Sequence, residues 1–145
     1  MRLTSFTDYG LRALMRIAGE PGRGFTTSEL AEEFQVSRNH LAKVISALAR
    51  GNYIETRRGG GGGAVLTRKP EDIRLGDVVA FLENGQALVE CFSSAGAACT
   101  LTPNCRLKAR LAQAEASFIA DLNRATLADC LYRPDSENTL RPTSP

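Results

Sequence analysis

The stretch that decides the fold is residues 27–67, which read TSELAEEFQVSRNHLAKVISALARGNYIETRRGGGGGAVLT. It opens with two short helical patterns separated by a tight turn. Thr27 or Ser28 is placed to cap the first helix, which we expect over 29–34, and Ser37 is placed to cap the second. Two such helices joined by a tight turn predict a helix-turn-helix.

Two strand-like segments, residues 52–56 and 64–67, follow the second helix. Between them lie Arg57, Arg58 and five consecutive glycines at 59–63. A helix-turn-helix followed by a basic hairpin is a winged helix, whose second helix enters the major groove of DNA while the wing touches the backbone or minor groove. We therefore expect a mainly α fold with a small β-hairpin wing.

The candidate DNA contacts are polar, basic or small residues at the two helix starts and at the wing. They are Thr27, Ser28, Ser37, Arg38, Asn39, His40, Lys43, Arg57, Arg58 and Gly59. Arginine and lysine side chains at such positions bind phosphates or base edges. The alternative is that these side chains form a solvated face and that the glycine run is a linker.

The segments that flank this head are also helical in pattern. Apolar residues recur at three- and four-residue steps in 5–18 and again in 73–82, which predicts a first helix and a connecting helix. Thr102 and Pro103 form a cap and first position typical of a helix start. The apolar stripe that follows consists of Leu107, Leu111, Ala114, Phe118 and Leu122. A helix this long favours a homodimer, since two-fold dimers bind two-fold operators; alternatively, the stripe packs on its own chain's first helix.

Three of the four cysteines, Cys91, Cys99 and Cys105, fall in the segment 91–105, CFSSAGAACTLTPNC. The segment is rich in Ser, Ala and Gly and has no helical or strand period, so it buries little. Thiolates grouped on such a loop favour a soft metal centre. Structural zinc held together with Cys130 is an alternative, but no C-x-x-C pair is present. We otherwise expect Cys130 to be a buried structural thiol.

Composition and charge exclude several other classes. Residues 1–70 hold 11 Lys and Arg against 6 Asp and Glu, a net of +5, and residues 71–145 hold 7 against 10, a net of −3. This asymmetry favours nucleic acid at one end. No run of about 18 apolar residues exists, so we expect no membrane span. The N-terminus lacks an apolar signal region, which indicates a cytoplasmic protein. No catalytic dyad or nucleotide-binding fingerprint is visible, so we expect no enzyme.

Several segments in register resemble one known family, the bacterial winged-helix repressors that carry iron–sulfur clusters. They are S-F-T-D-Y-G-L-R-A-L at 5–14, S-R-N-H-L-x-K-V at 37–44, R-G-x-x-G-G-x-x-L at 58–66, R-x-G-D-V-V at 74–79 and T-P-x-C-R-L-K at 102–108. The resemblance spans residue 1 to about residue 132. Within this family the chain is most similar to the nitric-oxide-sensing NsrR repressors, whose relatives include the iron regulator RirA and the cluster-assembly regulator IscR.

The resemblance implies a ligand set for an iron–sulfur cluster, [4Fe-4S] rather than [2Fe-2S]. Cys91, Cys99 and Cys105 match the three cluster cysteines. Asp8 stands where NsrR-like members supply a fourth ligand from the first helix of the partner subunit. An oxygen ligand binds iron more weakly than thiolate, so that corner is expected to be open to a small diatomic molecule. The alternative role for Asp8 is an i,i+4 ion pair with Arg12.

The resemblance divides the chain into five parts. We expect a winged helix-turn-helix DNA-binding domain at 1–70, a connecting helix at 71–90, a cluster-binding loop at 91–105, a long dimerisation helix and a short C-terminal helix at 103–132, and a disordered tail at 133–145. The implied function is a nitric-oxide-sensitive repressor that binds a palindromic operator in double-stranded DNA as a homodimer. The alternative is an iron- or cluster-status regulator of the same fold. The spacing between Cys91 and Cys99 is closer to the iron-regulator type, and both wing-tip positions are glycine.

Overall fold

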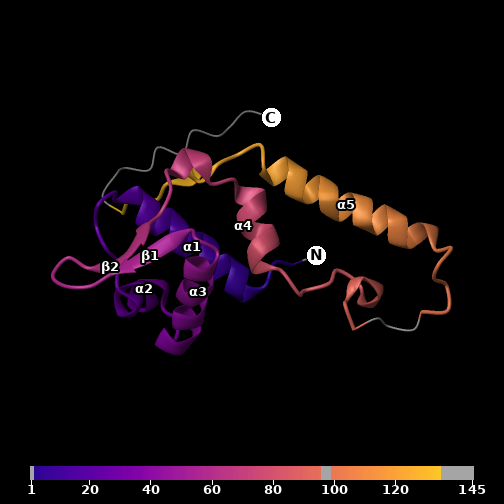
Figure 1. Ribbon diagram of the computed structural model, residues 1–145, viewed down its shortest axis with the longest axis horizontal. Helices are drawn as coiled ribbons and strands as arrows, with labels where there is room; N and C mark the ends of the chain where they lie inside the picture. The colour runs from indigo at the N-terminus through magenta and orange to yellow at the C-terminus, as the bar shows by residue number, and fades with distance from the viewer. Residues whose placement is uncertain (1, 96–98, 135–145) are drawn as a thin grey trace.

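The first half of the chain folds into a small helical head, and most of the second half extends from it as an arm (Figure 1). The structure is a computed structural model that describes residues 2–95 and 99–134. Its elements in chain order are α1 (Ser5–Gly19), α2 (Thr27–Phe34), α3 (Arg38–Arg50), β1 (Ile54–Arg57), β2 (Gly63–Leu66), η1 (Pro70–Asp72), α4 (Leu75–Leu82), η2 (Glu90–Phe92), α5 (Arg106–Leu122) and η3 (Leu127–Cys130). The predicted mainly α fold with a β-hairpin is confirmed.

Side-chain caps define where the helices of the helix-turn-helix begin. The Ser37 hydroxyl accepts a hydrogen bond from the His40 N–H at 3.1 Å, as predicted for the cap of α3. The cap of α2 is Thr26, not Thr27 or Ser28, because the Thr26 hydroxyl accepts the Glu29 N–H at 3.1 Å. Gln35 ends α2 in the left-handed conformation, with φ 56°, and so makes the tight turn between the two helices.

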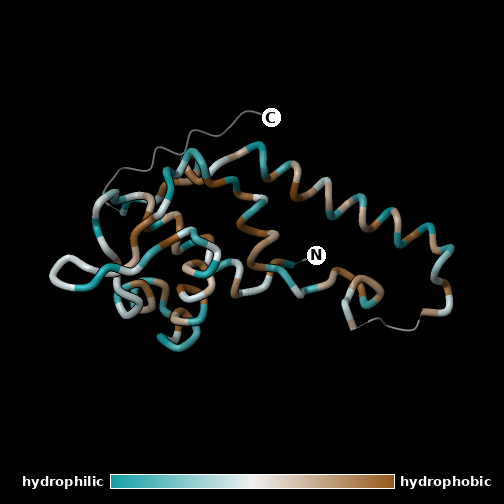
Figure 2. The backbone as a smooth tube through the Cα atoms, viewed as in Figure 1, coloured by the Kyte–Doolittle hydropathy of each residue, from teal (hydrophilic) through white to brown (hydrophobic). Residues whose placement is uncertain are grey.

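The core of the head draws one apolar face from each of its helices and from the hairpin. Figure 2 shows hydrophobic segments within the head, whereas hydrophobic and hydrophilic residues alternate along α5. The fully buried side chains include Leu14, Leu30, Leu41, Leu48, Ile54, Ile73, Val78 and Leu127. Since Leu127 lies beyond α5, the chain returns to the head after the arm.

The wing is the antiparallel pair β1 and β2, in which Ile54 faces Leu66 and Arg57 faces Gly63. Phe25, just before α2, adds a third partner: its N–H donates to Ala64 O at 3.0 Å and its carbonyl accepts the Ala64 N–H at 2.7 Å. Because Phe25 is itself buried, the wing is fixed to the start of α2 as well as to its own hairpin.

The arm begins later than predicted. Thr102 and Pro103 were expected to start the long helix, but the Thr102 N–H donates to Cys99 O at 3.2 Å in a turn. The first helical residue of α5 is Arg106, and its cap is Cys105, whose Sγ accepts the Lys108 N–H at 3.4 Å. The prediction of a helix from 103 was therefore wrong by three residues.

The last described residues pack back on the head. The Tyr132 N–H donates to Met15 O at 3.2 Å, and Arg133 lies against Gly19 of α1. Thr126 caps η3 as predicted, in a capping box with Asp129. The predicted disordered tail begins within this packed segment, and residues 135–145 lie outside the described residues.

Candidate nucleic-acid interface and cysteine loop

The start of α3 presents an exposed polar and basic surface. Ser37, Arg38, Asn39 and Lys43 are exposed, and His40 is half-buried. The opposite face of the same helix buries Leu41, Val44 and Leu48 in the core. This division places the predicted base- and phosphate-contacting side chains on one solvent-facing side.

Five of the predicted DNA contacts line one cavity of about 320 Å³, and they come from three elements. Thr27 and Ser28 lie at the start of α2, Arg38 at the start of α3, and Arg57 and Gly59 on the wing. Two arginines beside a helix N-terminus form a surface suited to a phosphate oxygen. Arg57 makes one exposed ion pair, with Glu55 at 3.2 Å, which water screens and a phosphate can displace.

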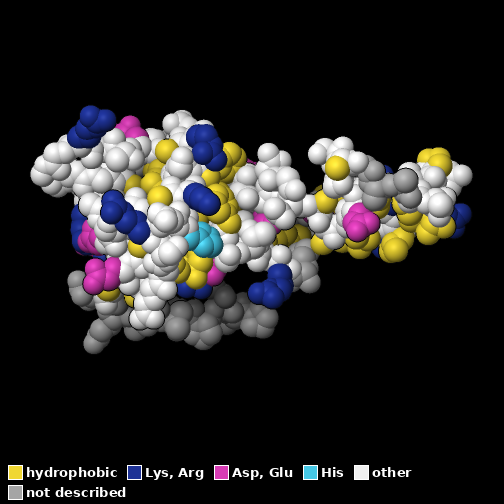
Figure 3. All heavy atoms as spheres, turned by 90° about the horizontal axis from the view of Figure 1, so that it is seen from below, with side chains coloured by type: hydrophobic (Ala, Val, Ile, Leu, Met, Phe, Trp, Pro, Cys, Tyr) yellow, Lys and Arg dark blue, Asp and Glu magenta, His cyan; other side chains and the backbone are white. Residues whose placement is uncertain are grey.

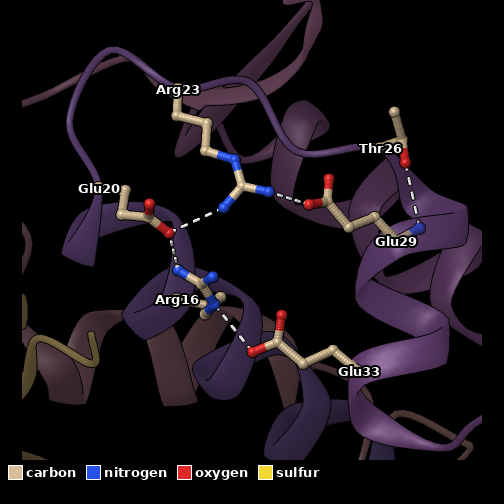
Figure 4. Close-up of polar contacts among 6 residues, drawn as sticks. All are labelled: Arg16, Glu20, Arg23, Thr26, Glu29 and Glu33. Carbon is tan, nitrogen blue, oxygen red and sulfur yellow. Dashed lines mark hydrogen bonds and ion pairs between the residues drawn. The ribbon is translucent and has the colours of Figure 1, made fainter. Parts of the chain in front are cut away.

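A charged network fixes α2 against α1 and so shapes this surface (Figure 4). Arg16 of α1 bonds Glu20 and, at 2.8 Å, Glu33 of α2. Arg23 in the intervening loop bonds Glu20 at 2.9 Å and also Glu29 of α2. These bonds keep the Glu29 carboxylate turned toward Arg23, although Glu29 stands in the first turn of α2.

Both arginines of this network lie against the Phe25 ring. The Cζ atom of Arg16 lies 4.8 Å from the ring centroid and that of Arg23 lies 4.4 Å from it. Both distances are in the range of cation–π attraction. The network therefore holds Phe25, the residue whose backbone is hydrogen-bonded to Ala64 of the wing.

The N-terminal turns of α1 contact the start of α3. The Tyr9 ring meets the His40 ring edge to face, with centroids 5.4 Å apart. The Arg12 guanidinium lies 5.4 Å from the Tyr9 centroid and binds both Asp8 oxygens, at 3.0 and 2.8 Å. Asp8 thus makes the i,i+4 pair that was its alternative role, while its side chain remains 48% exposed. Tyr9 was missed from sequence, although it lies beside Asp8 in the quoted 5–14 segment.

The cysteine loop lies at the end of α5 away from the head, whereas α1 lies within the head (Figure 1). Cys91 and Cys105 line one open cavity of about 740 Å³ together with Lys108. Cys99 is exposed and does not line this cavity. Within the described residues, no three His, Cys, Asp or Glu side chains converge as metal ligands. Asp8 and the cysteines of one chain are therefore not brought together.

The local chemistry of the thiols nevertheless fits a soft metal. Hydrogen bonds, the largest from the Leu101 backbone, hold the pKa of Cys99 below its ordinary value and favour the thiolate. Cys105 accepts the Lys108 backbone N–H at the start of α5. Cys130 lies in η3, half-buried rather than fully buried, and burial raises the pKa of its thiol. The three loop cysteines have the donor character that iron–sulfur clusters use.

One face of the molecule presents both basic side chains on the head and hydrophobic side chains on the arm. Figure 3 shows Lys and Arg side chains on the head around the histidine, and exposed hydrophobic side chains along the arm. Leu101 and Leu107, at the far end of the arm, are 69% and 64% exposed. Large apolar side chains this exposed mark a surface suited to a protein partner.

The family model described as Rrf2, iron-dependent transcriptional regulator, matches residues 3–133 of this chain. The chain belongs to the Rrf2 family. Its members are transcriptional regulators, not enzymes, and bind DNA. The Rrf2 match covers both the head and the arm. In the part of the chain that the structure describes, no helix has the length and apolar character needed to cross a bilayer.

Solved structures with a similar fold cover most of the chain. CymR, the global cysteine regulator of B. subtilis, is 24% identical, with a TM-score of 0.70 over 89% of this chain and 95% of that one. IscR of T. potens is 25% identical, with a TM-score of 0.68 over 89% and 85%. The oxidized form of Staphylococcus aureus CymR is 23% identical, with a TM-score of 0.69 over 94% and 100%. These likenesses establish the winged-helix fold with its extended arm.

Proposed function

We propose that this protein is a nitric-oxide-sensitive repressor that binds a two-fold operator as a homodimer and carries an iron–sulfur cluster. Cys91, Cys99 and Cys105 would hold the cluster, which is [4Fe-4S] in this proposal, and Asp8 of the partner subunit would complete the ligand set. The chain's own Asp8 lies in the head, away from the cysteine loop (Figure 1), which supports a ligand supplied across the dimer.

The observation that carries the proposal is the contact path from Asp8 to the recognition helix. Asp8 binds Arg12, Arg12 lies over Tyr9, and the Tyr9 ring meets His40 at the start of α3. An Asp8 carboxylate engaged elsewhere would leave Arg12 without this partner. Since Arg12 and His40 share the Tyr9 ring, the change reaches the DNA-facing surface through two contacts.

The head supplies operator contacts of two kinds. Arg38, Asn39 and His40 project from the start of α3, where a recognition helix reads base edges. Thr27, Ser28, Arg57, Arg58 and Gly59 stand at the α2 start and the wing and would contact phosphates, as would Lys43. Arg38 adjoins both groups because it lines the cavity with the wing.

A bound cluster would supply iron at which nitric oxide binds. The chain's residues would convert that event into lost affinity for DNA. An Asp8 carboxylate that no longer served as a ligand would make the two hydrogen bonds with Arg12 seen in this structure. The Arg12 guanidinium would then move relative to the Tyr9 ring, and that ring would shift His40 at the start of α3.

The test is an anaerobic titration of the purified protein with nitric oxide, following cluster absorbance and operator binding together. We expect cluster absorbance and operator affinity to fall in parallel in the wild-type protein. The operator affinity of Asp8→Ala should be the same before and after nitric oxide is added. Asp121→Ala is the matched control, since Asp121 also forms an exposed ion pair, with Arg124 at 3.4 Å. Operator affinity unchanged by nitric oxide would exclude the proposal.

The second candidate is an iron- or cluster-status regulator. The spacing of Cys91 and Cys99 favours it, as do the family description and the similarity to IscR. In that case an iron chelator abolishes operator binding, while nitric oxide leaves both the absorbance and the binding in place.

A further inference from the structure

The R-x-G-D segment at 74–77 joins the head to the end of α5. The Asn123 carboxamide oxygen accepts the Asp77 backbone N–H at 2.9 Å, and its NH₂ group donates to the Asp77 carboxylate at 2.9 Å. The Asn123 carbonyl accepts a hydrogen bond from Arg74 at 2.7 Å. We call Arg74, Gly76, Asp77 and Asn123 the latch.

Gly76 brings the two backbones of the latch together. A Cβ atom on Gly76 would collide with the Ile119 carbonyl oxygen and would lie 2.5 Å from the Asn123 side-chain oxygen. A backbone carbonyl cannot rotate away as a side chain can, so any larger residue must displace α5 itself. Glycine at this position therefore sets how closely α4 and α5 approach.

The latch is the tight part of the contact between α5 and the head. Farther along, a cavity of about 870 Å³ opens between α4 and α5, lined by Val79, Ala80, Ala112 and Ala116. Beyond it α5 extends away from the head (Figure 1). The direction of the arm is consequently determined near Asn123.

We propose that the latch sets the spacing between operator half-sites, an inference that rests on the proposed two-fold dimer. If two chains pair along α5, the angle between α5 and the head fixes how far apart the two recognition helices lie. The 17 residues of α5 span about 25 Å. A rotation of about 10° at the latch moves its far end by about 4 Å, more than the rise of one base pair, about 3.4 Å.

The experiment selects bound sequences from a random-sequence duplex DNA library with cluster-loaded protein. The proteins are wild-type, Asn123→Ala, Gly76→Ala and the control Asp77→Asn, whose side-chain oxygen still accepts from Asn123. Wild-type and Asp77→Asn should recover one half-site sequence at one spacing. Asn123→Ala and Gly76→Ala should recover the same half-site at a spacing shifted by a base pair or more, or at several spacings. They should bind the wild-type spacing about tenfold more weakly.

Each other outcome overturns the inference. Wild-type spacing and wild-type affinity in both Asn123→Ala and Gly76→Ala would show that the latch does not set the distance. Variants that lose the half-site sequence itself would show that the latch supports the head instead. If wild-type protein recovers single, unpaired half-sites, the two-fold operator of the proposed function fails and this inference falls with it.

Discussion

At the scale of single residues, Arg16 shows how a buried charge can organise a DNA-binding head. The residue is only 6% exposed, yet it bonds Glu20 and Glu33 and lies beside the Phe25 ring. Burial alone lowers the pKa of an arginine, but the hydrogen bonds that Arg16 donates to the Glu20 and Glu33 carboxylates outweigh this effect and raise its pKa. Its charge is therefore permanent, and its bond to Glu33 joins α1 to α2.

Replacing Arg16 with methionine should destabilise the protein by about 2–3 kcal/mol, because two carboxylates lose their buried partner and Phe25 loses a cation–π contact. The measurement is urea unfolding followed by circular dichroism. Arg124→Met is the matched control: Arg124 is 83% exposed and its single ion pair should contribute almost nothing. Equal midpoints for the two variants would contradict the role given to Arg16.

Glu83 gives a pH dependence that can be measured in the same way. Burial raises the pKa of Glu83, but hydrogen bonds from Thr7 and from the Thr4 N–H and hydroxyl outweigh it and lower the pKa. With a folded-state pKa below the unfolded value, the stabilisation is complete above the ordinary glutamate pKa, about 4.3, and is lost as the pH falls through the folded value. Glu83→Gln should therefore cost more stability at pH 7 than at pH 3; an equal cost at both would contradict this.

At the scale of elements, the wing depends on one close backbone approach. Gly63 begins β2 with φ +127°, and a Cβ there would lie 2.6 Å from the Phe25 carbonyl carbon. The hydrogen bonds between Phe25 and Ala64 require this closeness. The wing is thus positioned by the α2 start, and the two parts that line the 320 Å³ cavity are held together.

Gly63→Ala should destabilise the protein by about 1–3 kcal/mol and weaken operator binding, since both backbone strain and the Phe25 contact oppose a side chain. Gly60→Ala is a matched control in the same loop, because open space surrounds that position. Unfolding midpoints and operator titrations of the two variants check the prediction. An alanine tolerated equally well at both positions would mean that Phe25 does not anchor the wing.

The elements that could be predicted from sequence are those specified locally. Ser37 could be identified as a cap because a serine directly before a helical pattern of apolar residues is typical of an N-cap. Thr26 and Thr27 are chemically identical neighbours, so only the folded backbone distinguishes the true cap. Cysteine is not among the usual capping residues, which is why the start of α5 at Cys105 was missed. The contact of Tyr9 with His40 joins positions 31 residues apart in the sequence and had no local signature.

At the scale of the whole molecule, the arm leaves apolar side chains without partners in one chain. Within the part of the chain that the structure describes, α5 has no fully buried residue, although it carries the stripe from Leu107 to Leu122. The alternative, in which this stripe packs on the first helix of its own chain, is not seen at Leu107, which is 64% exposed. Pairing with a second chain would cover it.

Leu107→Glu combined with Leu111→Glu should convert a dimer to a monomer, because each change places a charge in the apolar stripe of both chains. Analytical ultracentrifugation measures the outcome. Gln113→Glu adds the same charge on the other side of α5 and should leave the dimer intact. A dimer that persists in the double variant would place the interface elsewhere.

The return of the chain to the head after α5 means that the arm is held at both of its ends. Leu127 fills the same core as Leu14 and Ile73, and Tyr132 bonds Met15, so both ends of the arm are anchored in the head. The arm is therefore an insertion in the head: the chain leaves the core of the head before the arm and rejoins it afterwards. Changes confined to the arm therefore leave the core of the DNA-binding head in place. A truncation after the wing, in contrast, would remove Leu127 from that core.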